Sequence, residues 1–458
     1  MKLGAKILVC TLMTAPLARS SIWVPAQGPT IQAAINSAGD GDTIIVADGT
    51  YSGPGNRDID FDGKNIVLMS ENGPEYTIID CDGTEADPHR AFYLKSGEDT
   101  TAVIEGFTIT DAYAADLHGN PWFDAAVLAE SASPTLRNCI VTANDCHGVR
   151  YSDATLHMYD CLVADNRGSG IVSDGCETTI INCEASFNDN YGVLWLAQWY
   201  GREFEMLSCL VRGNGWTGLN LFIGMGLFHV QNCTFVENLT GLNYEWNFPK
   251  LAVTGQSTAV VDVSTIEDCI MAYNSEYGLV AHVWAGEVIV RCNDAYGNGI
   301  EDYHEVGVGP DDDYDNISAD PLFCDQAVGN YHLSGNSPCA PENNSCGTLM
   351  GAFGVGCAPT GVDDDNPAAV PESYVLGQNW PNPFNPSTDI PFELPTAAHV
   401  KLEILNLLGQ PVATLIDRPM EAGFHTARWE ATGQPSGVYF YRIRSDSFCS
   451  CRKMVLLK

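Results

Sequence analysis

Basic residues are scarce in this chain. Its 458 residues include 22 Lys and Arg against 58 Asp and Glu, which gives a formal net charge of −36. A surface of this sign repels the phosphate backbone of nucleic acids and anionic lipid, so both are disfavoured as partners. Divalent cations such as Ca²⁺ are compatible with the charge, and a well-solvated extracellular surface is its simpler explanation.

Long apolar runs are also missing. Beyond the first twenty residues no run approaches the roughly 20 apolar residues that a membrane helix needs, so we expect no transmembrane helix. The first twenty residues look like a secretory signal, because Lys2 and Lys6 precede an apolar stretch over residues 7–17 and small residues follow at Ala18 and Ser20. The sequence therefore predicts a signal peptide over residues 1–20 and an exported mature chain.

What the chain does have is a repeated phrase. A short polar residue precedes a Cys, an Asn follows that Cys by five positions, and a Gly follows it by about nine. The successive cysteines are 22 to 36 residues apart. They are Cys139, Cys161, Cys183, Cys209, Cys233, Cys269 and Cys292, and Asn298 follows the seventh by six positions rather than five.

The repeat predicts stacked coils of short strands. The apolar runs between polar residues span only four to six positions and are rich in Val, Ile and Leu, which favours strands over helices. If each unit is one coil of three strands, successive coils stack at about 4.8 Å, and like residues lie above like residues. We expect the Cys column inside, and the Asn column at tight turns with its side-chain amides bonded between coils.

A stack of this kind needs caps at its ends. The segment "PTIQAAINSAGDGDTIIVADGTYSG" fits an N-terminal cap. Thr30 can N-cap a short helix that carries Ile31, Ala34 and Ile35, and a turn leads into a strand over residues 43–46.

These features resemble the right-handed parallel β-helix proteins of the pectate-lyase-like superfamily over residues 22–357. The resemblance implies an all-β fold for residues 21–357, a right-handed parallel β-helix of three-strand coils with an N-terminal helical cap, in a monomer. Members include pectate lyases, polygalacturonases, alginate epimerases and lyases, phage tailspikes and adhesins. The fold alone does not fix the function. The implied function is binding or processing of an extracellular polysaccharide, by a lyase, hydrolase or epimerase if the protein is an enzyme. The alternative is a non-catalytic adhesin or surface scaffold.

The cysteines divide into two predicted groups. Exported proteins commonly form disulfides. Stacked thiols in neighbouring parallel coils would need strained torsions to bridge, so the seven repeat cysteines are expected to be free. Disulfides are expected in the Gly- and Pro-rich closing segment, with no pairing assigned, among Cys324, Cys339, Cys346 and Cys357.

The composition changes at residues 358–373, a stretch rich in Pro, Asp and Ala that reads as a linker. Residues 374–458 alternate apolar and polar residues between turns, which predicts a small antiparallel β-sandwich. The segments "YVLGQNWPNPFNPSTDIPFELP", "PSGVYFYRI" and "KMVLLK" resemble the immunoglobulin-like type A sorting domain of the type IX secretion system. This resemblance implies export by the type IX machinery to the medium or outer cell surface of a Gram-negative-type bacterium. Cys449 and Cys451 depart from the usual pattern.

Two short strings contain candidate catalytic residues. Asp145, His147 and Arg150 could supply a base and an anion clamp, although they come from a single turn and a structural role is the simpler interpretation. Most other outward positions after the repeat glycines are uncharged, which argues against a lyase centre on that strand, and no polygalacturonase pattern is assembled.

The second string, "ADPHRAFY", contains Asp87, His89 and Arg90. Its Asp-Pro-His is similar to the catalytic motif of alginate epimerases, but the triplet that precedes the motif in that family is missing. An early loop is the favoured interpretation.

Two strings resemble calcium loops. Asp58, Asp60 and Asp62 precede a Gly but lack the bidentate Glu of an EF-hand, and strand and turn is the preferred interpretation. A surface Ca²⁺ site is a weaker hypothesis for the set Asp311, Asp313 and Asp315.

Aromatic side chains offer the most suggestive binding residues, because sugar rings stack on aromatic faces. Trp195 and Tyr244 fall on inward positions and are expected in the core. Stacking on a polysaccharide is predicted for Trp199, Tyr200, Trp216, Trp246 and Phe248.

Overall fold

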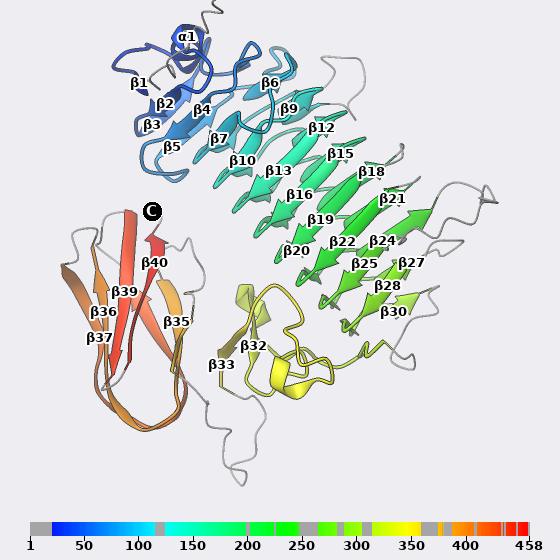
Figure 1. The fold of residues 1–458 in the computed structure, drawn as a ribbon, viewed down its shortest axis with the longest axis vertical. Coiled ribbons are helices and arrows are strands. Elements are labelled where there is room, and N and C mark those ends of the chain that lie inside the picture. The colour runs from blue at the N-terminus through cyan, green and yellow to red at the C-terminus, as the bar shows by residue number, and fades with distance from the viewer. Residues whose placement is uncertain are drawn as a thin grey trace, which may run out of the picture.

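The computed structural model describes most of the chain (Figure 1). The described residues are 21–114, 124–197, 202–223, 226–246, 264–281, 288–304, 314–358, 374–377, 379, 387–406, 410–431, 434, 437–445 and 448–456. The predicted signal peptide and nearly all of the predicted linker lie outside them.

Three parallel sheets wind around a common axis as a right-handed β-helix, and each coil from β4 onward gives one strand to each sheet. Sheet 1 contains eleven strands: β1 (Ser21–Val24), β2 (Thr43–Val46), β4 (Val67–Ser70), β7 (Val103–Glu105), β10 (Thr135–Arg137), β13 (Thr155–Tyr159), β16 (Glu177–Ile181), β19 (Glu203–Leu207), β22 (Leu227–Gln231), β25 (Ser264–Glu267) and β28 (Val288–Arg291).

Sheets 2 and 3 complete each coil. Sheet 2 contains β3 (Gly49–Ser52), β5 (Thr77–Asp80), β8 (Thr108–Thr110), β11 (Ile140–Thr142), β14 (Leu162–Ala164), β17 (Glu184–Ser186), β20 (Leu210–Arg212), β23 (Thr234–Val236), β26 (Ile270–Ala272) and β29 (Asp294–Tyr296). Sheet 3 contains β6 (Phe92–Leu94), β9 (Ala125–Glu130), β12 (His147–Ser152), β15 (Ile171–Asp174), β18 (Val193–Ala197), β21 (Thr217–Ile223), β24 (Thr240–Trp246), β27 (Tyr277–Ala281) and β30 (Glu301–His304).

The register confirms that like residues stack. Leu136 pairs with Met158 and Met158 with Ile180, and all three are buried. The cysteines from Cys139 to Cys269 form a buried column of free thiols, as the sequence predicts. Trp195 is also buried in this core, as expected.

An asparagine ladder runs along the turn between sheets 2 and 3. The Asn188 side chain accepts from Asn166 Nδ2 at 2.9 Å and donates to Asn214 Oδ1 at 3.0 Å. The same bond recurs from Asn144 to Asn298. The left-handed backbone angle falls on the residue before each Asn, for example Asp165 with φ 56°. The asparagines therefore bond between coils, whereas their predecessors make the turn.

The seventh repeat corrects the sequence prediction. Cys292 is not a free core thiol but forms a disulfide with Cys346. Its φ of 56° matches Asp268, the polar turn residue one coil earlier, and Asn293 Oδ1 accepts from the Cys269 backbone N–H. In the earlier coils a polar residue makes the turn and the Cys after it points inward. In the last coil Cys292 makes the turn and Asn293 points inward. The six-residue step to Asn298 is the signal of this reversal in the sequence.

The N-terminal cap is as predicted. Helix α1 (Ile31–Ser37) begins after Thr30, whose side chain accepts from the Ala33 backbone N–H at 3.2 Å. Its residues Ile31, Ala34 and Ile35 are fully buried against the first coils. An apolar helix face therefore covers core that would otherwise meet water.

A closing segment over residues 314–358 covers the other end and part of sheet 2. It contains β31 (Phe323–Asp325), β32 (Asn330–Ser334), β33 (Val355–Cys357) and two 3₁₀ turns (Gln326–Val328 and Pro341–Asn343). Tyr331, Leu333 and Met350 pack on Leu210 and Ile270, on the outer face of sheet 2.

The disulfides of this segment only partly match the prediction. Cys324 bonds to Cys357, whereas Cys339, predicted to be bridged, is a free buried thiol. Cys339 lies against Asp294 with no second sulfur beside it, and the Cys346 that it was grouped with bonds to Cys292.

The C-terminal domain consists of two antiparallel sheets that share a core. One sheet contains β34 (Val375–Leu376), β35 (Ser387–Leu394) and β38 (Gly423–Glu430). The other contains β37 (Pro411–Met420), β36 (Ala398–Leu405), β39 (Gly437–Ser445) and β40 (Phe448–Leu456), in that order. Within the described part of the chain, no helix is long and apolar enough to cross a membrane.

Candidate functional site

The structure does not bring Asp145, His147 and Arg150 to one point. Each is instead bonded to the next coil, 22 to 24 residues on. The Asp145 carboxylate pairs with the Arg167 guanidinium at 2.8 Å, and Arg150 pairs with Asp174 at 3.0 Å. His147 is buried and its Nδ1 accepts from the Ser169 backbone N–H at 2.7 Å. These contacts hold neighbouring coils together, so the three residues have the structural role that was the simpler interpretation of their sequence.

Asp87 and His89 lie in a polar cluster at the edge of the first coils. The His89 ring lies between two carboxylates, with Nδ1 at 2.6 Å from Asp58 and Nε2 at 3.2 Å from Asp87. Arg57 also approaches Asp87, at 3.6 Å. The arrangement joins one loop to the preceding coil, in agreement with a loop role.

The side chain of Arg90, the third residue of this string, points away from the cluster, although its backbone N–H donates to Asp58 Oδ1 at 3.1 Å. It is fully buried with Asp124, with Arg90 Nη2 at 2.8 Å from Asp124 Oδ1. A paired and buried guanidinium cannot clamp a substrate anion at the surface. The pair therefore serves the packing of the first coils.

The described residues contain no group of three or more His, Cys, Asp or Glu side chains that could hold a metal ion. Asp311 and Asp313 lie outside the described residues. Asp315 accepts a hydrogen bond from Ser345 Oγ at 2.8 Å. In the other calcium-like string, the Asp60 carboxylate accepts from the Asp62 backbone N–H at 3.0 Å, and Ile59 is buried, as strand and turn would require.

Of the predicted sugar-binding aromatics, only Trp216 has a described side chain. It is 41% exposed on the turn that carries the asparagine ladder, and the Tyr191 ring contacts it edge to face at 5.1 Å. Trp199, Tyr200 and Phe248 lie outside the described residues, as does the side chain of Trp246.

The outer face of sheet 3 leaves little open surface, whereas that of sheet 2 is partly exposed on its first coils. On sheet 3, the outward Leu128 and Val172 are buried, and Arg150 is buried beside its partly exposed partner Asp174. On sheet 2, the closing segment covers the last coils. Sheet 1 is different, because its outward side chains are at least partly exposed on coil after coil.

We call this exposed surface the sheet 1 face. It consists of two columns of side chains that stand two and four positions before the inward column of cysteines and Asn293. The first column is Arg137, Tyr159, Ile181, Leu207, Gln231, Glu267 and Arg291, and the second is His157, Thr179, Glu205, His229, Thr265 and Ile289.

Aromatic and cationic groups meet at the N-terminal half of the sheet 1 face. The Arg137 guanidinium lies over the Tyr159 ring, 5.7 Å from its centre, and the His157 ring is 6.2 Å from the same ring. Partial burial lowers the pKa of His157, and Arg137 lowers it further, against the opposing effect of Glu177. His157 is therefore neutral at pH 7, with ring nitrogens suited to hydrogen bonds with hydroxyl groups.

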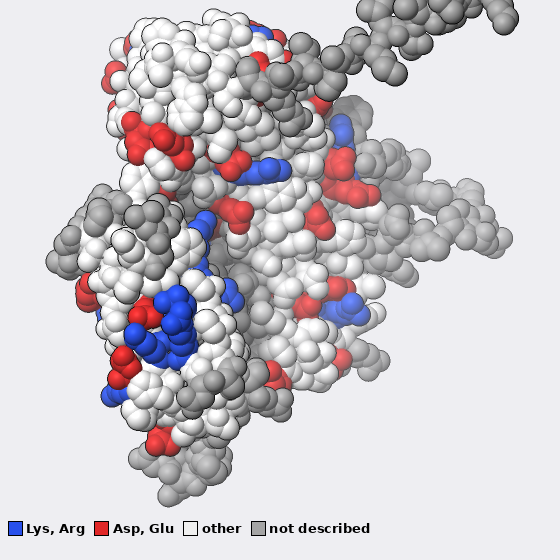
Figure 2. All heavy atoms as spheres, turned by 60° about the vertical axis from the view of Figure 1, so that its left-hand side comes forward, with Lys and Arg blue, Asp and Glu red and all other residues white. Residues whose placement is uncertain are grey.

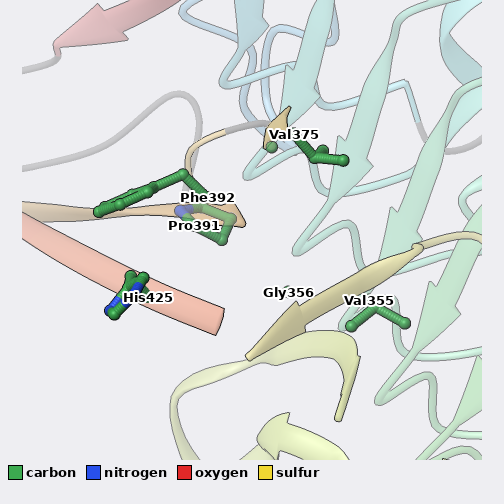
Figure 3. A pocket seen from close by; sticks show the side chains of 7 residues that line it. Val355, Gly356, Val375, Pro391, Phe392 and His425 are labelled. Atoms are coloured by element: carbon green, nitrogen blue, oxygen red, sulfur yellow. The ribbon is translucent and has the colours of Figure 1, made fainter. Parts of the chain in front are cut away.

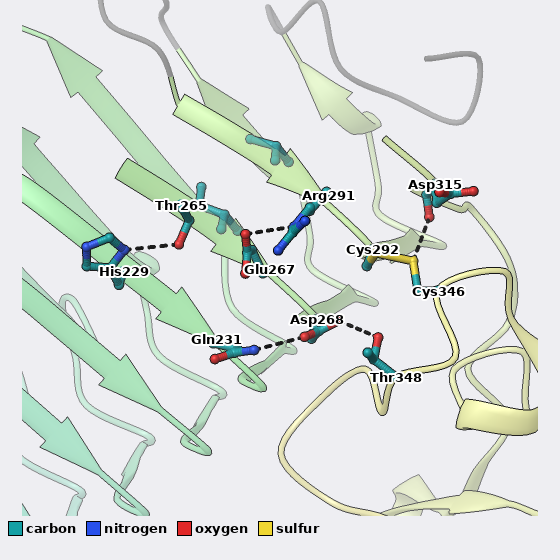
Figure 4. Close-up of polar contacts among 12 residues, drawn as sticks. His229, Gln231, Thr265, Glu267, Asp268, Arg291, Cys292, Asp315, Cys346 and Thr348 are labelled. Carbon is teal, nitrogen blue, oxygen red and sulfur yellow. Dashed lines mark hydrogen bonds and ion pairs between the residues drawn. A yellow bond between two sulfur atoms is a disulfide. The ribbon is translucent and has the colours of Figure 1, made fainter. Parts of the chain in front are cut away.

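The C-terminal half of the sheet 1 face is hydrogen-bonded along the columns (Figure 4). His229 Nδ1 lies 3.2 Å from Thr265 Oγ1, and Arg291 Nε donates to Glu267 at 2.8 Å. Between the halves, a group of carboxylates that includes Glu205 forms no ion pair within the described part of the chain. The group is Glu177, Glu203 and Glu205, with Ile181 and Leu207 beside it.

This face was not predicted from the sequence, because the outward positions considered there follow each repeat Gly and belong to sheet 3. The available signal was the alternation of strand residues. Once Leu136, Met158 and their equivalents point inward, their two neighbours must point outward, and these neighbours include Arg137, Tyr159 and His157.

Charge is divided unevenly between the two parts of the chain. Residues 374–458 hold 8 of the 22 Lys and Arg but only 7 of the 58 Asp and Glu. Figure 2 shows basic side chains gathered on one face of the C-terminal domain, while the β-helix surface above it is mainly acidic or uncharged. The net negative charge of the chain therefore belongs to the β-helix part.

A small pocket lies where the C-terminal domain meets strand β33 (Figure 3). Val355, Gly356, Pro391, Phe392 and His425 line it, with Val375 and Gly377. This lining contains no carboxylate and no Lys or Arg. The pocket therefore has the character of a packing seam and does not offer the groups that polysaccharide chemistry requires.

Comparisons with known proteins agree with this architecture. Residues 90–258 match the family model of the right-handed beta helix region. Residues 378–457 match the model of the secretion system C-terminal sorting domain. No curated protein matches the chain.

Solved structures share the fold. Pectate lyase Pel9A is similar with a TM-score of 0.50 and 15% identity, over 74% of this chain and 96% of that one. A tailspike protein of Escherichia coli O157:H7 bacteriophage CAB120 has a TM-score of 0.43 and 10% identity, over 96% and 69% of the two chains. The periplasmic alginate epimerase AlgG has a TM-score of 0.34 and 12% identity, over 60% and 75%.

The coil repeat, the three parallel sheets and the family match define a right-handed parallel β-helix, a fold that pectate lyase Pel9A shares. More particularly, it is a β-helix protein with a C-terminal sorting domain of the type IX secretion system, which marks it as a secreted protein.

Proposed function

We propose that this protein binds an extracellular polysaccharide along the sheet 1 face. The observation that carries the proposal is the pair of partly exposed columns, one over seven coils from Arg137 to Arg291 and the other over six coils from His157 to Ile289. The face combines a ring surface at Tyr159, apolar patches at Ile181 and Leu207, and hydrogen-bonding groups at His229. Sugar polymers present hydroxyl groups and apolar ring faces alternately, so a regular surface of this kind suits an extended chain.

We also propose where the protein acts. The type IX machinery would be the protein's export partner, and the outer cell surface or the medium its destination. A surface protein that holds a polysaccharide needs no catalytic centre, and the candidates Asp145, His147 and Arg150 are all engaged in contacts between coils. Binding is therefore the first function to test, ahead of lyase, hydrolase or epimerase activity.

The test is a panel of neutral and acidic polysaccharides against residues 21–458, with binding measured by calorimetry and cleavage by new reducing ends or unsaturated products. Tyr159→Ala should weaken the strongest interaction about tenfold, a loss of about 1.4 kcal/mol, because it removes the ring on the sheet 1 face. Trp216→Ala is the matched control, since it removes an exposed ring from a different turn.

Equal losses of affinity in the two variants would show that binding is not specific to the sheet 1 face. A loss confined to Trp216→Ala would assign it to the turn with the asparagine ladder. Product formation by the unmodified chain would add catalysis and direct attention to Glu177, Glu203 and Glu205.

A structural scaffold is the second candidate function. The observation that favours it is that charged side chains are used to join coils, as in the pairs Asp145–Arg167 and Glu184–Arg212. A protein that binds no member of the panel, with either readout, would fit this candidate better than the first.

A further inference from the structure

The C-terminal domain has four edge strands, and three of them are protected. Strand β37 contains Pro411 and Pro419 and pairs with β36 through two register shifts. Strand β34 is only two residues long, and β38 lies beside β33 of the closing segment. Prolines, bulges, short length and cover are the usual ways in which an edge strand avoids pairing with another chain.

Strand β40 has no Pro, no bulge and no short length to protect it, although β34 lies beside it, with Leu376 O accepting from Arg452 Nε at 2.6 Å. It is nine residues long, contains no Pro, and pairs with β39 without a register shift. No strand of the described chain is hydrogen-bonded to its other edge. Its backbone groups therefore form an open template for another strand.

The same strand carries the two exposed free thiols found among the described residues, Cys449 and Cys451. The other free cysteines of the described chain are buried, or half-buried in the case of Cys146. Because Cys449 and Cys451 are two positions apart, they project from the same face of β40, about 6.6 Å apart. Their parallel side chains cannot approach the sulfur-to-sulfur bond length without bending the strand. Oxidation of this pair must therefore involve another molecule.

We propose that two copies of the chain pair through their β40 strands, antiparallel and around a two-fold axis at Ser450, and are joined by two disulfides. An axis at Ser450 sets Cys449 of each copy opposite Cys451 of the other. Opposed residues in antiparallel strands have Cα atoms about 4.5–5.5 Å apart, inside the 4.4–6.8 Å range of disulfides. One symmetric contact thus pairs the backbone groups of two edge strands and joins four thiols in two disulfides. This dimer replaces the monomer that the sequence resemblance implies.

The charge near the strand is spread out in the paired arrangement. On β40 itself the axis sets Arg452 opposite Phe448 of the other copy, so the two Arg452 residues are offset by four positions, about 13 Å along the strands. Arg442 and Arg444, the cross-strand neighbours of Cys451 and Cys449, lie on β39. In the paired arrangement the two β39 strands are three strand spacings apart, about 14 Å. This separation exceeds the Debye length of about 8 Å at physiological ionic strength, so the repulsion is screened.

The chemistry is thiol–disulfide exchange with a low-molecular-weight disulfide. A Cys449 thiolate attacks one sulfur of the oxidant and releases a thiol. The Cys451 thiolate of the other copy then attacks the mixed disulfide and releases the second thiol. Each new disulfide consumes one oxidant disulfide and two protein thiols and yields two small thiols, which balances atoms and electrons.

The test uses residues 21–458 with oxidised glutathione, followed by non-reducing electrophoresis, light scattering and peptide mass mapping. The unmodified chain should give a reductant-sensitive dimer with a Cys449–Cys451 cross-link. Cys449→Ser and Cys451→Ser should each lose the covalent dimer, because each thiol then faces a serine. Mixing these two variants should restore a covalent heterodimer, which is the specific signature of the Ser450 axis.

Cys146→Ser is the matched control, since it removes a partly accessible thiol elsewhere and should leave the dimer unchanged. A Cys451–Cys451 link in the Cys449→Ser variant would contradict the register. A monomer that carries glutathione, or a monomer with both thiols free after oxidation, would overturn the proposal.

Discussion

The Cys339 thiol lies 3.1 Å from Asp294 Oδ2, although the two residues are 45 positions apart. Asp294 lies on the outer face of sheet 2 at the last coil, in register with Ile270, and Cys339 comes from the closing segment that folds back over it. The other Asp294 oxygen accepts from the Ala319 backbone N–H at 3.0 Å. Both residues are fully buried, so this contact joins the closing segment to the β-helix in the absence of water.

Asp294 should make the protein less stable as the pH rises. Burial raises its pKa to about 7, against the lowering effect of the two hydrogen bonds. Between the unfolded pKa of about 3.9 and this value the folded state binds more protons than the unfolded state, so the free energy of unfolding falls by up to about 1.4 kcal/mol per pH unit. Urea unfolding at pH 4.5, 6 and 7.5 measures this loss.

Asp294→Asn isolates the effect, because an amide keeps an oxygen acceptor but cannot ionise. We expect this variant to lose most of the slope between pH 4.5 and 7, while the exposed Asp189→Asn variant keeps it. An unchanged slope in Asp294→Asn would assign the pH dependence to other carboxyl groups.

An asparagine in the middle of the ladder should contribute more to the free energy of unfolding than the one at its end. Asn188→Ala removes two acceptor and two donor contacts within a buried stack, including the bond to Val163 O at 3.1 Å. Unsatisfied buried groups above and below should cost about 3 kcal/mol of unfolding free energy, measured by urea denaturation. Asn298→Ala, at the last coil, should cost about 1 kcal/mol, and equal costs would contradict a continuous stack.

The cysteine column should be inert in the folded protein. Burial raises the pKa of Cys209 and Cys233 well above the ordinary thiol value. In the Cys449→Ser/Cys451→Ser variant, we expect a thiol reagent to label Cys146 slowly and the column only after guanidinium unfolding. Rapid labelling of the column in native buffer would show that the coils open locally.

The Arg90–Asp124 pair should be structural. Arg90→Met removes the cation that pairs with the buried Asp124 carboxylate and should cost about 3–5 kcal/mol of stability. The double variant Arg90→Met/Asp124→Leu should recover most of this loss, because it removes both charges together. Thermal unfolding compares the two variants with the unmodified chain, and both variants should keep the polysaccharide affinity of the unmodified chain. A double variant as unstable as the single one would point to a wider polar network.

The periodic part of the molecule could be predicted from the sequence, since stacked coils repeat the same environment. One Cys, Asn and Gly pattern was enough to place Leu136, Met158 and Ile180 inside, and the Thr30 cap and the alternation in residues 374–458 are equally local signals. The prediction failed where the repeat ends: Cys292 and Asn293 exchange places, and Cys339 meets Asp294 rather than a sulfur.

The candidate site could not be predicted from the sequence, and the reason is physical. Spacing shows that Asp145, His147 and Arg150 are near in the chain, but only the stacking of coils shows that each is bonded to the next coil. The same stacking gathers Tyr159, His157 and Glu205 on one face from two coils. The coil and its inward residues can be read from the sequence alone, because they depend on local periodicity. Which outer face stays open and which thiols meet can be known only from the folded chain, because both depend on contacts between segments far apart in the sequence.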